Sequence, residues 1–122
     1  DARKGVNMFE MDSIDVPVLG IIENMSYFSP EEFPEKKYYI FGKDGAKNLS
    51  EQLNINLLAQ IPIVQSVREA CDAGRPAVLQ SNSEISKSFL NLAKNVVDVI
   101  DKRNSDLPIT EAVKITNMKG CS

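Results

Sequence analysis

Helical and strand-like hydrophobic patterns alternate along this chain. Apolar residues recur at spacings of three and four in residues 1–12, 44–53, 64–73 and 82–103, which predicts four amphipathic helices. Residues 16–22 and 57–61 are instead short and almost continuously apolar, a pattern typical of parallel strands that are buried on both faces. This alternation predicts an α/β fold with a mostly parallel sheet.

Boundary residues help to place these elements. Asp44 is expected to cap the second helix, and the spacing of Ser81 and Glu84 resembles a capping box before the longest helix. Pro62 lacks a backbone N–H, so we expect it to close the second strand.

A charged loop at residues 29–37 contains two prolines and five charged residues, which argue against regular structure there. It separates two short aromatic segments, residues 25–28 and 38–41, which could pair as a hairpin. After residue 103 the chain continues as a tail, in which residues 112–116 could add an edge strand or stay disordered.

Composition narrows the function classes. The 122 residues fit one domain, and a hydrophobic content of 43% is ordinary for a globular protein. The formal charge of −3 gives no electrostatic field that would attract nucleic acid or an anionic membrane. The chain contains no histidine, so no imidazole of this chain can act as a general base or bind a metal ion. We expect a cytoplasmic protein with reduced thiols, in which Cys71 packs in a helix rather than acting as a nucleophile.

Asn24 is the first candidate binding residue. It follows the apolar run at residues 16–22 almost directly, and open α/β sheets bind ligands beyond the carboxyl ends of their strands. The residues alone leave two interpretations equally open: a ligand-contacting amide, or a core strand that happens to end near an Asn.

Several separated segments resemble the carboxyl-terminal half of the Mrp/ApbC family of P-loop ATPases, relatives of MinD and ParA that are implicated in carrying iron–sulfur clusters. The matching segments, in the family's order, are residues 1–6, 16–26, 40–46, 61–62, 67–70 and 74–76. The resemblance implies that residues 1–103 are the carboxyl-terminal part of a doubly wound, mostly parallel P-loop NTPase domain, incomplete in this chain, with residues 104–122 as its tail.

The resemblance also implies a site at the base end of a nucleotide. Asn24 would hydrogen-bond the edge of adenine, and Pro62, Ile63 and Val64 would pack against the base, although Pro62 serves equally well as a strand terminator. The implied cofactor is ATP with Mg²⁺ in the full-length protein. This sequence contains no Gly-x-x-x-x-Gly-Lys-Ser/Thr motif and no apolar strand that ends in a magnesium-binding Asp, so we do not expect the chain alone to hydrolyse ATP.

Family members commonly hold a bridging iron–sulfur cluster between two subunits through a Cys-x-x-Cys in the loop after Asn-Met-Ser. Residues 29–34 contain no cysteine, and carboxylates are poor substitutes for thiolates, which argues against that route here. Cys121 in the tail is a weak candidate ligand. The implied partners are a second copy of the protein and iron–sulfur client or assembly proteins.

Two functions stay open at this stage. The chain could be part of an ATP-dependent iron–sulfur carrier, or it could be a nucleotide-independent interaction module that uses residues 25–41 as a docking surface.

Overall fold

The computed structural model describes residues 1–30, 32–80 and 83–112, and two strands and four α-helices are present in these ranges. In chain order the elements are α1 (Ala2–Phe9), β1 (Gly20–Phe28), α2 (Gly45–Leu53), β2 (Asn56–Ile63), α3 (Gln65–Asp72), the 3-10 turn η1 (Ala77–Leu79) and α4 (Glu84–Asp106). The α/β class predicted from the sequence is confirmed. Most of the possible edge strand at residues 112–116 lies outside the described residues.

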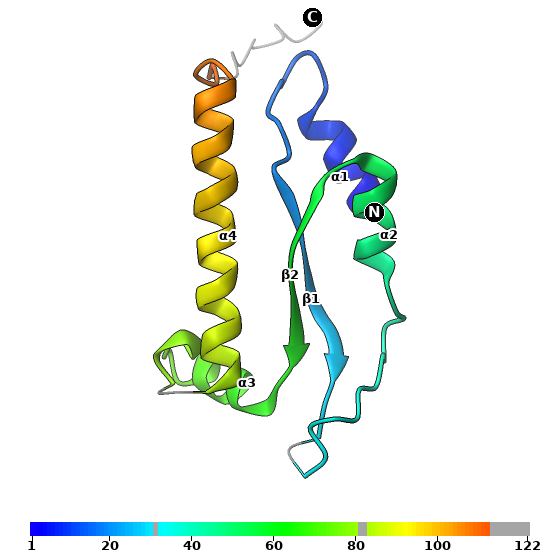
Figure 1. Cartoon of the computed structure of the whole chain (residues 1–122), viewed down its shortest axis with the longest axis vertical. Helices are drawn as coiled ribbons and strands as arrows, with labels where there is room; N and C mark the ends of the chain where they lie inside the picture. The colour runs from blue at the N-terminus through cyan, green and yellow to red at the C-terminus, as the bar shows by residue number, and fades with distance from the viewer. Residues whose placement is uncertain (31, 81–82, 113–122) are drawn as a thin grey trace, which may run out of the picture.

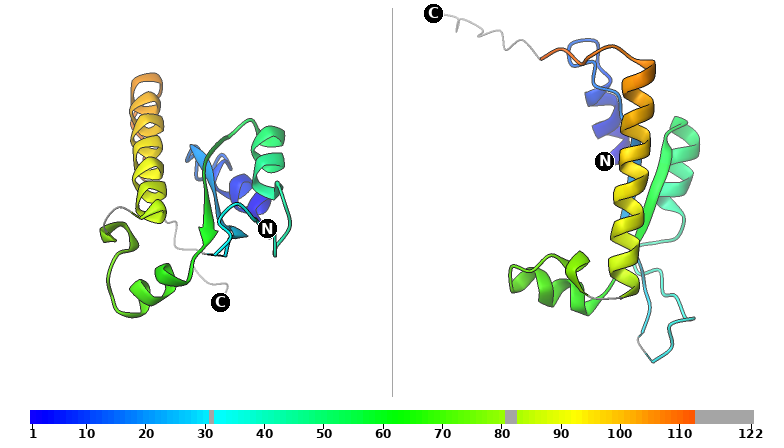
Figure 2. Two further views of the ribbon diagram at one scale, coloured as in Figure 1. Left: turned by 60° about the horizontal axis from the view of Figure 1, so that its bottom comes forward. Right: turned by 60° about the vertical axis from the view of Figure 1, so that its left-hand side comes forward.

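The strands form a parallel sheet with helices on both faces (Figure 1). α2 connects β1 to β2 and lies with α1 on one face, where the Arg3 guanidinium donates a hydrogen bond to the Gln52 side chain. α4 runs along the opposite face (Figure 2). Its Asn95 amide donates a hydrogen bond to the Leu58 carbonyl of β2 at 2.8 Å. The sheet is therefore a layer between two layers of helix.

The first strand differs from its prediction. It begins at Gly20 rather than at residue 16 and continues to Phe28, and Ile22 within it is 46% exposed rather than buried. Gly20 pairs with Asn56, the first residue of β2, so residues 16–19 have no partner in this ladder. The apolar run correctly predicted that a strand lies here. It did not predict the exposure of Ile22, because the sheet has only two strands in the described residues and its surface is partly uncovered.

Helix capping also differs from the sequence-based expectations. Within the described residues, the Asp44 side chain makes no capping hydrogen bond, and its φ of 60° places it in the left-handed region. α4 begins at Glu84 and not at residue 82: its cap is Ser83, whose hydroxyl oxygen accepts a hydrogen bond from the Ser86 N–H at 3.1 Å. Ser83 supplies the capping hydroxyl, and Ser81 lies outside the described residues.

The predicted hairpin between the aromatic segments is reduced to one antiparallel bridge. Phe28 and Tyr38 exchange both backbone hydrogen bonds at 2.8 Å, and no other pairing joins the segments within the described part of the chain. Cys71 on α3 is exposed, so its predicted packing role is wrong. Ala70 is the buried residue of that helix.

The hydrophobic core is thin. The buried apolar residues come one from each of five elements: Val6, Ile61, Ala70, Ala77 and Ile85. α4 exposes a second apolar stripe at Leu90, Val97 and Ile100, beside the stripe that faces β2. Among the described helices, none is long and apolar enough to cross a bilayer.

Two isoleucines of α4 test where the core lies. Ile85 is 5% exposed and Ile100 is 40% exposed, so replacing each with alanine removes the same atoms from different environments. Ile85→Ala should lower the free energy of unfolding by about 2–3 kcal/mol, and Ile100→Ala by less than about 1 kcal/mol. Urea denaturation followed by circular dichroism measures both. Equal losses of unfolding free energy in the two variants would show that Ile85 and Ile100 are buried to the same extent, contrary to this structure.

Candidate functional site

The carboxyl ends of β1 and β2 lie side by side at the lower end of the sheet in Figure 1, and α3 follows β2 directly. Pro62 and Ile63 end β2, Val64 follows them directly, and Asn24 lies within β1. Asn24 is paired in register with Ile61, the residue before Pro62. The structure thus brings Asn24 next to the segment 62–64, in the region where open α/β sheets bind ligands.

Asn24 does not end its strand, contrary to the prediction. Regular pairing stops after the pair Asn24↔Ile61 and resumes only at Phe28↔Ile63. Residues 25–27 of β1 therefore lie opposite Pro62 alone. Pro62 has no N–H to donate to the ladder, which explains why β1 bulges at this point instead of pairing.

The bulge has a defined internal geometry. Met25 has a φ of 55°, an uncommon left-handed conformation for a non-glycine residue, and its N–H donates to the Asn24 side-chain oxygen at 3.0 Å. Ser26 is buried, and its hydroxyl donates to the Ile61 carbonyl at 3.2 Å. Ser26 thus replaces a ladder hydrogen bond that the bulge interrupts, and it fixes Asn24 opposite β2.

The Asn24 side chain is exposed at this position. Its oxygen keeps one lone pair free after accepting from Met25, and no partner within the described residues occupies its amide nitrogen. The side chain can therefore offer both a donor and an acceptor to a ligand.

The opposite side of the site comes from residues 62–64, which are half-buried. Pro62 and Ile63 belong to β2, so the strand does not close at Pro62 as predicted. Val64 follows in an extended conformation as the residue that precedes α3. Together these residues present a largely apolar surface beside a polar amide.

Glu23 is a residue that the sequence analysis missed. One carboxylate oxygen accepts a hydrogen bond from the Ala46 N–H in the first turn of α2 at 3.1 Å, and the other accepts from the Gln60 side chain at 2.6 Å. This carboxylate supplies the cap that Asp44 does not. The sequence did contain one indication of this role, because Glu23 is a charged residue between the apolar run 16–22 and Asn24.

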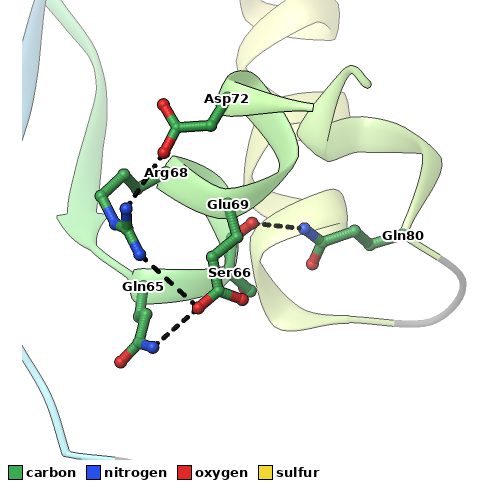
Figure 3. A network of polar contacts seen from close by, with 6 residues as sticks. All are labelled: Gln65, Ser66, Arg68, Glu69, Asp72 and Gln80. Atoms are coloured by element: carbon green, nitrogen blue, oxygen red, sulfur yellow. Dashed lines mark hydrogen bonds and ion pairs between the residues drawn. The ribbon is translucent and has the colours of Figure 1, made fainter. Parts of the chain in front are cut away.

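A surface polar network lies mostly within α3, and one of its contacts reaches the residue after η1 (Figure 3). Gln65 donates to Glu69 at 2.7 Å, Arg68 forms an ion pair with Asp72 at 3.0 Å, and Gln80 donates to the Ser66 carbonyl at 3.0 Å. The charged side chains are more than half exposed, so each ion pair contributes little to stability. The Gln80 contact connects the residues after η1 to α3.

Two hollows lie apart from the candidate residues Asn24 and 62–64. One of about 300 Å³ lies between α3 and η1, and one of about 690 Å³ lies at the opposite end of the sheet, between the loop after α1 and residues 107–112. Neither is lined by Asn24 or by residues 62–64. The candidate residues therefore lie outside both of these hollows.

The described part of the chain contains no group of cysteines that could bind an iron–sulfur cluster. Cys71 is its one cysteine there, and Cys121 lies outside it. No group of three or more Cys, Asp or Glu side chains in the described ranges could hold a metal ion.

Comparison with known proteins gives a consistent picture. The ParA family model described as NUBPL iron-transfer P-loop NTPase matches residues 1–97. The iron-sulfur cluster transfer protein NUBPL of Mus musculus is 42% identical over 98 residues, which cover 80% of this chain and 30% of the mouse protein. The iron-sulfur cluster carrier protein of Haemophilus influenzae is 42% identical over 109 residues, or 88% of this chain and 29% of that protein.

A solved structure is similar as well. The nucleotide-binding protein from Archaeoglobus fulgidus, in complex with ADP, is 32% identical with a TM-score of 0.53, and the match covers 61% of this chain and 29% of that one. The chain thus spans about a third or less of the length of the relatives it matches. Because the family model covers residues 1–97, including Asn24 and residues 62–64, the resemblance read from the sequence is confirmed, and the chain belongs to the ParA family of NUBPL-type iron-transfer P-loop NTPases.

Proposed function

We propose that this chain forms the base-binding side of an ATP-dependent iron–sulfur cluster carrier. Asn24 would hydrogen-bond the adenine edge, and Pro62, Ile63 and Val64 would pack against the ring. The observation that carries the proposal is the register pair Asn24↔Ile61, which puts an exposed amide beside an apolar segment at the carboxyl ends of two parallel strands.

The chemistry of the amide suits adenine. Adenine presents a hydrogen-bond donor, its N6 amino group, next to a ring-nitrogen acceptor. Asn24 offers the complementary pair, since its nitrogen donates and the second lone pair of its oxygen accepts. The hydrogen bond from Met25 fixes the oxygen, so that the nitrogen is directed away from the backbone of the bulge.

The phosphate side is proposed to come from residues outside this sequence. This sequence contains no P-loop motif, and its relatives are about three times as long as the matched segment. ATP with Mg²⁺ would then bind across two parts of the protein, of which this chain supplies the base side.

The transfer function is proposed from the relatives, whose names describe iron–sulfur cluster transfer and carrier proteins. Iron–sulfur client or assembly proteins would be the partners, and the protein would act as a homodimer. Loop 29–34 would supply no cluster ligand, because it contains no thiol. The cytoplasmic location expected from the sequence stays a prediction.

A second candidate function has its own supporting observation. Three lysines of the segment 33–43 lie over aromatic rings: the ammonium groups of Lys36, Lys37 and Lys43 are 4.6, 4.4 and 5.2 Å from the ring centroids of Phe33, Tyr27 and Tyr39. The same segment exposes Ile40 and Phe41, the latter by 73%. A structured loop with exposed apolar side chains suits a nucleotide-independent docking surface.

Replacing Asn24 tests the first proposal. In the full-length product of the gene, Asn24→Ala should weaken ATP binding about tenfold or more, because two hydrogen bonds to the base are lost. Isothermal titration calorimetry measures the affinity. Asn48→Ala, an exposed asparagine of α2, is the matched control and should leave the affinity unchanged. Equal affinities of the Asn24 variant and the wild type would rule out this base site.

Replacing Phe41 tests the docking surface. Phe41→Asp puts a charge into the exposed apolar segment, so it should weaken self-association of the full-length protein about tenfold both with and without ATP. Sedimentation velocity over a concentration series measures this change. Ile109→Asp, at a residue that is 92% exposed near the other end of the sheet, is the control. Unchanged association of the Phe41 variant would count against residues 25–41 as an interface between copies.

A further inference from the structure

Glu23 is the one carboxylate among the described residues that connects three secondary-structure elements. It lies on β1, accepts a hydrogen bond from the Ala46 N–H of α2 at 3.1 Å, and accepts another from the Gln60 side chain of β2 at 2.6 Å. Its side chain is half-buried between them. Hydrogen bonds to a charged acceptor are stronger than those between neutral groups, which favours a fixed geometry.

The position of these contacts relates them to the base-side residues. The pair Glu23↔Gln60 comes one step before Asn24↔Ile61 in the register, and Pro62 follows directly. After this step the ladder is interrupted by the bulge at residues 25–27. The Glu23 contacts are therefore the last side-chain link between the strands on the α2 face before the irregular segment.

Backbone hydrogen bonds cannot position the site alone. Pro62 offers no N–H, and Met25 is in a left-handed conformation, so the ladder gives little support on the far side of Asn24. On that side the Ser26 hydroxyl bonds the Ile61 carbonyl. Asn24 is thus held between two side-chain contacts, the Glu23 carboxylate before it and the Ser26 hydroxyl after it.

We propose that Glu23 is a positioning residue for base recognition: through Ala46 and Gln60 its carboxylate sets the orientation of Asn24 relative to Pro62, and so the selectivity for adenine. This inference rests on the proposed function. Glu23 points away from the base, because successive side chains of a strand point to opposite faces and its own contacts lie with α2. It acts on the nucleotide through Asn24 and not by contact.

The contacts of Glu23 can be removed one at a time. Glu23→Ala removes both hydrogen bonds. Glu23→Gln keeps an oxygen that accepts from Ala46 but replaces the other with an amino group, which cannot accept from Gln60. Gln60→Ala removes the contact across the strands and leaves the one to α2. Glu51→Ala, at an exposed carboxylate of α2, is the matched control.

The readout must separate base recognition from stability. In the full-length protein, the affinities for ATP, GTP and magnesium tripolyphosphate would be measured by calorimetry, together with the thermal midpoint. Tripolyphosphate has no base, so a positioning role predicts that Glu23→Ala weakens ATP binding about tenfold while tripolyphosphate binding is unchanged. The preference for ATP over GTP should fall, and Glu23→Gln and Gln60→Ala should show smaller losses.

Each outcome has a clear meaning. If Glu23→Ala lowers the thermal midpoint but leaves the ratio of ATP to tripolyphosphate affinity as in the wild type, Glu23 is only a helix cap and the inference is overturned. If Asn24→Ala weakens ATP binding and Glu23→Ala does not, the inference fails while the proposed function stands. If neither variant changes ATP binding, the proposed function itself fails.

Discussion

The parallel pairing of β1 with β2 is the interaction on which the other features of this chain depend. It places two carboxyl-terminal strand ends side by side, although their residues are more than thirty positions apart in the sequence. It also gives α2 and α4 opposite faces to cover, which separates the helices into two layers. Because pairing in register relates Asn24 to Ile61, a shift by one residue would turn Asn24 toward α2 and remove the site.

Pro62 limits this pairing near the carboxyl ends of the two strands. A proline inside a strand removes a ladder donor, and here the partner strand responds with a bulge of three residues rather than by ending. The left-handed Met25 costs about 1 kcal/mol or more, which the hydrogen bonds of Asn24 and Ser26 help to offset. Strained backbone of this kind is concentrated at binding sites, where the surrounding contacts define it.

Much of this arrangement could be predicted from the sequence, because periodicity depends on burial and burial follows from the fold. The α/β order and both strands were predicted correctly, whereas Asn24 lies within its strand and not at its end. The strand bounds were not, since an apolar run at residues 16–19 predicts a strand whether or not a partner lies beside it. Cys71 was misassigned for a related reason: residue type predicts average burial, while the actual burial depends on which face of α3 the residue occupies.

Glu23 shows why the rest could not be predicted. A capping residue is sought within a few positions of the helix that it caps, and Asp44 met that criterion. The group that bonds the first turn of α2 instead lies 23 residues earlier in the chain, and only tertiary folding brings it there. Its second contact, to Gln60, depends equally on strand register. A residue that joins three elements leaves almost no local signature, because each of its contacts depends on folding that brings distant segments of the chain together.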